Sequence, residues 1–281
     1  MRKLYYYLKS LSNYQQTLFV QFLLYVTTAL GLLFVFDLKL FLLGLAVGWL
    51  LFCFGVSISL HKWISHRTFT PKNRLIKLFL LWAAAQSTLG SPIGFAAGHR
   101  QHHRDSDGPT DPFALSNSVW HNVKLWFYHF STEHIGARLV KDLASDRDFK
   151  FFHKHYWRIW VVVPLVLTVI NPLYFIYFVA VPAVYVFLGM SYVTVIAHSL
   201  GWKRIFNGTN PYNDLDDSWD SRFFTVLFAG EGYHHTHHVH PGQYNYKDVN
   251  GLADPSGWII KYLRYESVER TEHSQAHDQL V

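Results

Sequence analysis

Cysteine is nearly absent from this chain, with Cys53 the single example among 281 residues. One thiol excludes an internal disulfide, a cysteine zinc finger and a cysteine-ligated iron–sulfur cluster. The sequence also lacks a Gly-x-Gly-x-x-Gly loop for a flavin or nicotinamide. His240-Pro241-Gly242 is like the start of a cytochrome b5 haem motif, but Gln243 follows and too few residues remain for that domain. We therefore expect any electrons to come from another protein.

Charged residues are also scarce, at 16%, whereas 50% of the chain is hydrophobic and 18% is aromatic. This composition is typical of a membrane protein. Four apolar runs of about twenty residues, each long enough to cross a bilayer, occupy approximately residues 17–36, 40–60, 159–178 and 179–198. Because the runs are joined in pairs by short connections, the sequence predicts one all-α, multi-pass membrane domain over residues 1–281, with four transmembrane helices in two hairpins.

The distribution of basic residues predicts the orientation of these helices. Lys39 is the only Lys or Arg in either short connection. By the positive-inside rule, both termini and a helical cap made of residues 61–158 and 199–281 should be cytoplasmic, in a bacterial inner membrane or the endoplasmic reticulum. The net charge of +6 then requires no nucleic acid, because membrane lipids or an acidic partner can account for it. The start of the chain, with Tyr5 to Tyr7, is expected to anchor at the interface.

Residues 75–97 form one further apolar segment that is long enough to cross. A crossing here would separate His61 and His66 from the histidines that begin at His99, and Gly90 and Pro92 interrupt its second half. We therefore expect a helix that lies against the membrane or within the cap.

Nine of the 18 histidines lie at the borders of apolar segments, which is unusual because imidazole is costly to place there without a function. Imidazole is the commonest ligand of iron, copper and zinc, and nine of them indicate more than one metal ion. The candidate ligands are His61, His66, His99, His102, His103, His198, His234, His237 and His238. The other histidines, such as His121 and His155, are assigned to the surface.

Helix geometry gives different expectations for the clusters. His99, His102 and His103 have i, i+3, i+4 spacing, and so do His234, His237 and His238, so each set could point three imidazoles at one place. Residues five apart lie about 140° around an α-helix. His61 and His66 should therefore converge only if the helix ends and the chain bends before His66, or each should serve a different metal.

These motifs resemble those of the integral membrane fatty acyl desaturases of the Δ9, stearoyl-CoA desaturase-like type, over roughly residues 40–250. HKWISHRTF, starting at His61, is like the first histidine box of that family. HRQHH with the acids that follow it is like the second box, and GEGYHHTHH, starting at Gly230, is like the third. His198, shortly before Gly201, is similar to the family's additional histidine.

The resemblance implies a non-haem di-iron centre, held by the nine histidines, that uses dioxygen to introduce a double bond into a fatty acyl chain. Zinc also fits such imidazole sites. No catalytic residue beyond the metal ligands is expected. Acidic side chains should orient the rings, and the candidates are Asp105, Asp107, Asp111 and Glu231. Thr194 stands where the family often has an asparagine that reaches a metal through water, and His235, also in place of an asparagine, is expected to lie outside the ligand set.

The resemblance further implies an apolar tunnel for the acyl chain beside the second membrane helix. Leu45 and Trp49, with Gly44 and Gly48 alongside, should close its far end. Aromatic candidates for its walls are Trp82, Trp120, Trp126, Phe127 and Trp219, and basic candidates for binding a CoA, carrier-protein or lipid headgroup are Arg67, Arg74, Arg100 and Lys141. The expected partners are a fatty acyl thioester or acyl lipid, and a ferredoxin or cytochrome b5 as electron donor.

Two other functions are compatible with the histidine clusters. A membrane hydroxylase of alkyl or fatty acyl chains uses similar boxes, although the spacing of the first pair and the Gly-Glu-Gly sequence at residues 230–232 favour a desaturase. A metal-transport protein would instead place histidines along a path through the bilayer, whereas here they gather at one membrane face.

Overall fold

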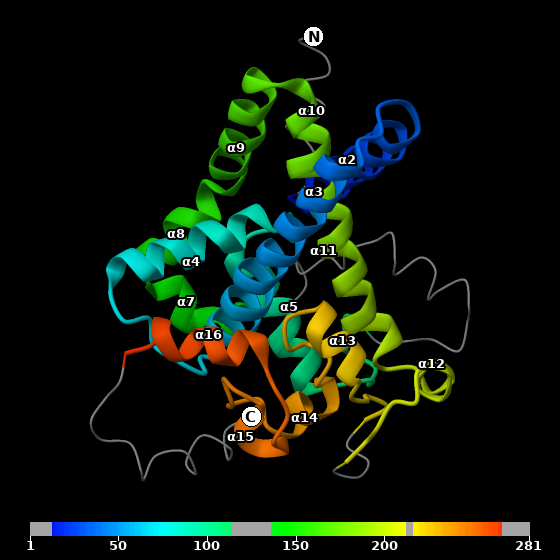
Figure 1. Cartoon of the computed structure of the whole chain (residues 1–281). Helices are drawn as coiled ribbons and strands as arrows, with labels where there is room; N and C mark the ends of the chain where they lie inside the picture. Colours follow the sequence, from blue (N-terminus) through cyan, green and yellow to red (C-terminus); the bar gives the residue numbers. More distant parts are fainter. Residues whose placement is uncertain (1–12, 114–135, 212–215, 266–281) are drawn as a thin grey trace.

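The computed structural model describes residues 13–113, 136–211 and 216–265, and every named element in these ranges is a helix. The all-α prediction is therefore confirmed for the described residues. Figure 1 shows long helices extending from a compact group of shorter helices and loops. In chain order, the elements are α2 (Asn13–Phe34), α3 (Leu38–Leu51), η1 (Phe52–Ser65), α4 (Arg74–Gln86), α5 (Pro92–Arg104), η2 (Ala137–Val140), α7 (Lys141–Ser145), α8 (Arg147–Lys154), α9 (Tyr156–Ile170), α10 (Pro172–Phe175), η3 (Ile176–Ala180), α11 (Val181–Ser191), η4 (Tyr192–Ile196), α12 (Leu200–Ile205), α13 (Arg222–Leu227), α14 (His234–Val239), α15 (Lys247–Asn250) and α16 (Pro255–Leu263).

The first predicted hairpin consists of α2 and of α3 with its direct continuation η1. Its two apolar helices, Gln16–Phe34 and Leu38–Ser65, are both long enough to cross a membrane. Asp37 begins α3 by accepting a hydrogen bond from the backbone amide of Leu40 at 2.9 Å. The phenol of Tyr177 donates to the carbonyl of Val35 at 2.6 Å and accepts from the amide of Asp37 at 2.7 Å. The polar backbone of this turn is thus satisfied by the chain itself.

The second hairpin turns at a different place from the one predicted. The prediction divided it into residues 159–178 and 179–198, but α9 ends at Ile170 and a single apolar helix runs over Pro172–Ile196. Asn171 accepts a hydrogen bond from the amide of Leu173, and Pro172 occupies the first helical position, so this pair starts the new helix. The described residues therefore contain three helices long enough to cross, plus the shorter apolar helix α9.

The ambiguous segment at residues 75–97 is divided between two 13-residue helices, α4 and α5. The break between them includes Thr88 and Gly90, which both have positive φ angles. Neither helix reaches the length of about twenty residues that a crossing requires. On α4, Leu75, Phe79 and Trp82 are exposed, whereas Leu80 and Leu81 are buried. This distribution suits a helix with one face on the protein and one toward the membrane interface.

The middle of the molecule is occupied by η1, whose residues are almost all buried. It packs against α4, α5, α11 and α16. Its predecessor α3 lies very close to the last long helix, because a Cβ atom on Gly44 would come within 2.3 Å of the Tyr177 carbonyl oxygen. A Cβ atom on Gly48 would likewise meet the side chain of Tyr185 at 2.7 Å. These contacts bring the helix that carries His61 alongside the helix that leads to His198.

Candidate metal centre

His61 and His66 are brought together by a π-helix, which the sequence analysis did not anticipate. In η1 the backbone hydrogen bonds join residues five apart, and the amide of His66 donates to the carbonyl of His61 at 3.2 Å. In such a helix, two residues that are five apart in the sequence are about one turn apart and lie on the same face. The ring centroids of His61 and His66 are therefore only 5.1 Å apart. The helix does end before His66, as one alternative expected, but π-helical winding and not a bend brings the two rings together. The other alternative, that each serves a different metal, is not supported, because both belong to one set of converging histidines.

Each of the two three-histidine sets divides between two positions instead of converging on one. His99 and His103 of α5 lie together, whereas His102 faces another set of rings. On an α-helix, i and i+4 differ by about 40° while i+3 lies about 60° to the other side. In α14, His234 and His238 stay together and His237 faces away from them, toward His99 and His103. The i+3 histidine of each helix thus joins the pair from the other helix.

The nine candidate ligands consequently form two groups. The five-histidine group contains His61, His66, His99, His103 and His237, and the four-histidine group contains His102, His198, His234 and His238. Within the five-histidine group, the Nε2 atoms of His66 and His99 are 2.6 Å apart, and the Nε2 atom of His237 lies 2.9 Å from that of His61 and 2.8 Å from that of His103. In the four-histidine group, the Nε2 atoms of His198 and His234 are separated by 2.8 Å.

The arrangement of protons shows that these groups fit metal ions. The Nδ1 atoms of His102 and His238 both face carboxylates, Asp111 and Asp216, so each Nδ1 carries the ring proton. Their Nε2 atoms are then bare acceptors, yet they lie 3.3 Å apart. Two facing lone pairs repel unless a cation lies between them. Nitrogen ligands about 2.0–2.1 Å from one metal are separated by about 3 Å, which matches these distances. Each group could therefore hold a metal ion.

Most of the carboxylates proposed to orient the rings lie against them. Glu231 accepts a hydrogen bond from His61 Nδ1 at 2.8 Å, and the hydroxyl of Ser57 donates to the same carboxylate at 2.5 Å. Asp111 lies 2.8 Å from His102 Nδ1, and Asp107 lies 3.1 Å from His198 Nδ1. Such contacts fix the orientation and the tautomer of a ligating ring.

Asp105 and Thr194 have their hydrogen bonds elsewhere. Asp105 accepts from the backbone amide and the hydroxyl of Thr110, within its own loop. The Thr194 hydroxyl donates to the carbonyl of Met190, one helical turn earlier, at 2.8 Å. His235 is fully buried and lies outside both groups, with its Nδ1 atom 2.9 Å from the Ser218 hydroxyl.

Two residues that contact the histidines were missed by the sequence analysis. Asp216 pairs with His238 Nδ1 and also accepts from the Ser106 hydroxyl at 2.9 Å. The hydroxyl of Tyr246 lies 2.8 Å from His237 Nδ1. Asp216 belongs to a short acidic run before Trp219, which is the only signal in its neighbourhood, and Tyr246 follows the third box without a motif of its own. Both positions depend on chain folding that local spacing does not reveal.

Burial keeps most of the rings neutral, as metal ligands must be. It lowers the pKa of His66, His99 and His103 well below the ordinary value, and the neighbouring histidines add to this effect. Burial, with His198 and His102 nearby, lowers the pKa of His238 to about 3 in spite of Asp216. For His198, burial is outweighed by the hydrogen bond and charge of Asp107, which raise its pKa.

The third box is positioned by a buried acid and by glycine. Asp220 accepts from the Thr236 backbone amide at 3.0 Å and from the Thr236 hydroxyl, which fixes the first turns of α14. Burial raises the pKa of Asp220 to about 6. Gly230 has a φ of +110° and lies where a Cβ atom would come within 2.3 Å of an Asp254 carboxylate oxygen. The chain therefore needs glycine here to bring Glu231 next to His61.

The family-model comparison decides the class of protein to which this centre belongs. The fatty acid desaturase model matches residues 38–248, which include all nine histidines. The chain belongs to the fatty acid desaturase family. Its relatives include the sn-1 stearoyl-lipid 9-desaturase of Anabaena variabilis, with 27% identity over 212 residues, 74% of this chain and 73% of the relative. The Delta(9)-fatty-acid desaturase fat-7 of Caenorhabditis elegans is 29% identical over 68% of this chain and 58% of its own length. Acyl-CoA desaturase 1 of Saccharomyces cerevisiae is 27% identical over 73% of this chain and 41% of its own length.

This membership makes the chain a fatty acyl desaturase, and the hydroxylase and metal-transport alternatives are not favoured. The predicted tunnel residues of the desaturase can now be placed. Leu45 is half-buried, and the Trp49 indole donates to the carbonyl of Val226 in α13 at 3.0 Å. The neighbouring Gly44 and Gly48 lie against the last long helix.

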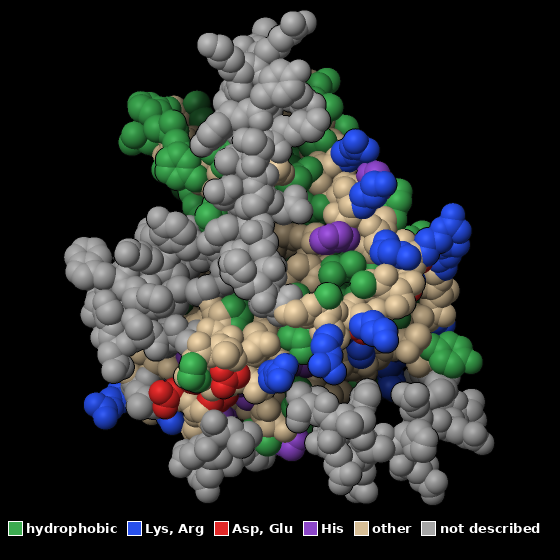
Figure 2. All heavy atoms as spheres, turned by 180° about the vertical axis from the view of Figure 1, so that it is seen from behind, with side chains coloured by type: hydrophobic (Ala, Val, Ile, Leu, Met, Phe, Trp, Pro, Cys, Tyr) green, Lys and Arg blue, Asp and Glu red, His purple; other side chains and the backbone are tan. Residues whose placement is uncertain are grey.

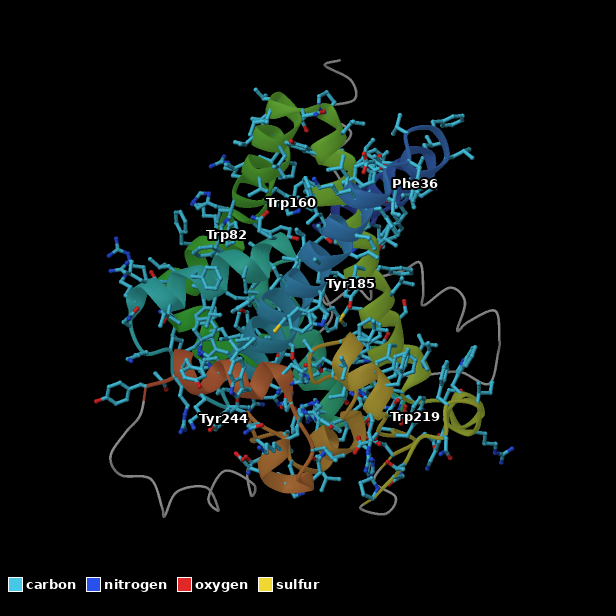
Figure 3. The ribbon with its side chains drawn as sticks, viewed as in Figure 1. Phe36, Trp82, Trp160, Tyr185, Trp219 and Tyr244 are labelled. Atoms are coloured by element: carbon cyan, nitrogen blue, oxygen red, sulfur yellow. The ribbon has the colours of Figure 1, made fainter. Side chains whose placement is uncertain are left out.

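The predicted aromatic wall is only partly supported by position. Trp219 is fully buried and its indole donates to the Ile196 carbonyl at 2.9 Å, close to His198 in the chain. Trp82 is 41% exposed, and Figure 3 shows it at the outer edge of the molecule, far from Trp219. Trp120, Trp126 and Phe127 lie outside the described residues, as do His121 and the tyrosines at positions 5–7.

The predicted basic residues are largely engaged in ion pairs. Arg100 bonds to Asp142 at 2.7 Å and to the backbone carbonyls of Ile64 and Ser65, so it joins α5 to the end of η1. Arg67 also pairs with Asp142, and Arg74 pairs with Asp148. A more open basic surface lies along α8 and the start of α9, on the side where Figure 2 shows Lys and Arg gathered. Its exposed members are Arg147, Lys150, Lys154 and Arg158.

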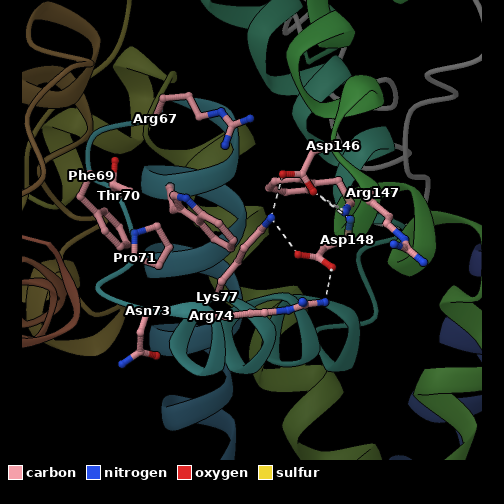
Figure 4. Close-up of a pocket in the computed structure, with 12 residues that line it drawn as sticks. Arg67, Phe69, Thr70, Pro71, Asn73, Arg74, Lys77, Asp146, Arg147 and Asp148 are labelled. Carbon is pink, nitrogen blue, oxygen red and sulfur yellow. Dashed lines mark hydrogen bonds and ion pairs between the residues drawn. The ribbon is translucent and has the colours of Figure 1, made fainter.

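A cavity of about 680 Å³ lies beside this basic surface, and Figure 4 shows its walls. Trp63, Phe69 and Phe149 provide aromatic surface, and Lys77 bridges Asp146 at 2.7 Å and Asp148 at 2.9 Å. In the described part of the chain, none of the nine histidines lines it. The cavity is thus separate from the candidate metal centre, and its ion pairs tie α4 to α8.

Proposed function

We propose that the chain is a dioxygen-dependent desaturase of the Δ9 type with a di-iron centre. The proposed ligands are His61, His66, His99, His103 and His237 for one iron, and His102, His198, His234 and His238 for the other. The observation that carries this proposal is the convergence of nine histidine side chains in two groups within a desaturase-family chain, with the bare Nε2 atoms of His102 and His238 facing each other. Zinc also fits imidazole ligands, so a preparation can carry it in place of iron.

When bound, the iron pair supplies an oxidant strong enough to remove two hydrogens from adjacent methylenes, as dioxygen takes up two further electrons and two protons to form two waters. The chain's own residues prepare the site for this reaction. Neutral imidazoles leave the metals with high positive charge, and Glu231, Asp107, Asp111 and Asp216 hold the rings in place. Most of the nine histidines are buried, which shields their rings from bulk water.

Four membrane crossings and a cytoplasmic cap are part of the proposal. The three long apolar helices support a membrane location, and α9 would be the fourth crossing, preceded on the cytoplasmic side by basic residues of α8. Under the positive-inside rule, both termini and the metal centre then face the cytoplasm. The exposed face of α4 would rest at the membrane interface.

The substrate is proposed to be a fatty acyl group carried as a thioester or in a lipid. Relatives are named for both kinds of carrier, among them an sn-1 stearoyl-lipid desaturase and an acyl-CoA desaturase. Leu45 and Trp49 are proposed to limit the length of acyl tail that the enzyme accepts.

An external one-electron carrier, a ferredoxin or a cytochrome b5, is proposed as the electron donor. The sequence has no cysteine set or nucleotide loop for a redox cofactor of its own. The exposed residues Arg147, Lys150, Lys154 and Arg158 offer a basic surface for an acidic donor. Turnover of the purified enzyme with NADPH alone would contradict this part of the proposal.

Product analysis tests the function directly. The chain would be expressed in a desaturase-deficient host, and the acyl chains would be analysed by mass spectrometry for new double bonds and their positions. We expect monounsaturated chains with the double bond at carbon 9. Hydroxylated chains would support the hydroxylase instead, and unchanged acyl chains with altered cellular metal content would support transport.

A further inference from the structure

Lys62 is a charged side chain with no exposed surface, and the proposed function does not use it. Its Nζ atom lies 2.7 Å from an Asp254 carboxylate oxygen and donates to the Ser256 hydroxyl at 2.7 Å and to the Tyr244 carbonyl at 3.1 Å. Burying such an ion pair is costly unless both charges are well hydrogen-bonded, as they are here. Lys62 directly follows His61, so the pair connects η1 to the segment after the third box.

Asp254 also forms hydrogen bonds with other groups within residues 244–257, and so links them to Lys62. The carboxylate oxygen that meets Lys62 also accepts from the backbone amide of Tyr246 at 3.0 Å. Its other oxygen accepts from the amide of Gly257 and the hydroxyl of Ser256, each at 3.0 Å, and thereby caps α16. The backbone of Tyr246 is thus fixed relative to the helix that carries His61.

Tyr246 reaches the five-histidine group. Its ring is buried, with Lys62 Nζ 4.3 Å from the ring centroid, and its hydroxyl lies 2.8 Å from His237 Nδ1. When His237 binds a metal through Nε2, its Nδ1 carries the proton and donates to the phenol oxygen. That hydrogen bond stops the ring from rotating about its Cβ–Cγ bond, which would carry Nε2 away from His61 and His103.

We propose that Lys62, Asp254 and Tyr246 are positioning residues that hold His237 in the five-histidine group, so that residues 244–257 govern retention of that metal alone. The inference rests on the proposed two-metal centre. No comparable contact reaches the four-histidine group from this segment in the described residues, because the Nδ1 partners of His102, His198 and His238 are Asp111, Asp107 and Asp216. Loss of the Tyr246 hydroxyl should therefore affect one metal ion and leave the other.

Cobalt binding to the purified, metal-stripped enzyme provides a readout other than activity. We expect the wild-type chain to bind about two Co²⁺ ions, with absorption bands that report each site. Tyr246→Phe should weaken one of the two ions by about 10–100-fold, the usual effect of removing a hydrogen bond behind a ligand. His237→Ala identifies which bands belong to the five-histidine group. Tyr244→Phe is the matched control, because the Tyr244 side chain meets Arg264 and, among the described residues, none of the nine candidate ligands, and it should leave both ions unchanged.

The ion pair is tested by Lys62→Met combined with Asp254→Leu, which removes both charges and avoids leaving one buried without a partner. We expect this variant to fold, as judged by thermal unfolding, and to weaken the same cobalt ion. Adding Tyr246→Phe should then cause little further loss, because both changes act through His237.

Equal weakening of both ions by Tyr246→Phe, or additive losses in the combined variant, would overturn the inference. So would a Tyr246→Phe enzyme that binds two ions with wild-type affinity. A wild-type chain that binds fewer than two ions would instead overturn the metal centre itself, so the two failures are distinguishable.

Discussion

The five-histidine group and the four-histidine group both take histidines from α5 and α14 but differ in what surrounds them. Helix α5 contributes His99 and His103 to the first group and His102 to the second. Helix α14 contributes His237 to the first group and His234 and His238 to the second. In the four-histidine group, three of the four rings are backed by carboxylates, whereas in the five-histidine group the identified partners are Glu231 and the neutral phenol of Tyr246. The five-histidine group thus has more candidate ligands, and the four-histidine group has more carboxylates bonded to its rings.

Because of this difference, the two groups would offer unequal surroundings to the two proposed metal ions. Carboxylates behind the rings make imidazole a stronger donor and stabilise positive charge on the metal. The four-histidine group therefore compensates for a smaller ligand number through Asp107, Asp111 and Asp216. The five-histidine group depends on ring placement, for which η1 supplies His61 and its C-cap residue, His66.

Removal of a ligand should have the largest effect and should separate the groups most clearly. His237→Ala and His238→Ala change adjacent residues of α14 that belong to different groups. We expect both variants to lose all desaturation, because the reaction needs both metals, and each to retain about one metal ion per chain. Elemental analysis and product analysis would check this. Loss of both ions from either variant would show that the groups are not independent.

Substitution of the acids that bond to the ligating rings should have intermediate effects. Asp216→Asn should weaken metal binding in the four-histidine group by about 10–100-fold, and Glu231→Gln should do the same in the five-histidine group. Competition with a chelator, followed by elemental analysis, would measure each affinity. Asp105→Asn is the control, because Asp105 bonds to Thr110 and should affect neither metal. If Asp216→Asn and Glu231→Gln released the same ion, the proposed pairing would be wrong.

Changes on the basic surface should leave both groups intact and alter only electron delivery. Lys150→Glu with Lys154→Glu reverses two exposed charges on α8, and we expect the KM for a reduced donor protein to rise several-fold. The effect should shrink as salt shortens the Debye length from about 10 Å toward 3 Å. Arg204→Glu changes an exposed charge on α12 and serves as the control. An unchanged KM for the donor would place docking elsewhere.

The smallest effect is expected at Trp49, which is far from the metals along α3. Trp49→Ala should leave metal content and turnover near wild type but shift products toward longer acyl chains, because the indole volume is removed. Trp49→Phe keeps much of the ring while losing the bond to Val226, at a cost of about 1 kcal/mol in stability. Mass spectrometry of the acyl products would compare the variants. An unchanged chain-length profile in a stable Trp49→Ala enzyme would assign this residue to packing.

The local features of the fold were predictable because they depend on neighbouring residues. The apolar runs predicted the bounds of the first hairpin closely, and residues 75–97 are divided between two 13-residue helices near Gly90, where the sequence predicted an interruption. The second hairpin was misplaced because apolarity continues through its turn. Only the cap made by Asn171 and Pro172 marks the position.

Residue type and spacing by themselves indicated the chemistry: nine imidazoles at the ends of apolar segments, with nearby acids, already predict a metal centre. Tertiary structure decided how the nine histidines are divided between the two groups. The π-helical winding of η1 brings the rings of His61 and His66 close together, and the packing of α5 against α14 places each i+3 histidine in the opposite group. Asp216 and Tyr246 reach their histidines only through folding of segments that carry no motif. The physical reason is that ligand identity is a property of side chains, whereas the division into groups depends on helix winding and on contacts between segments distant in the chain.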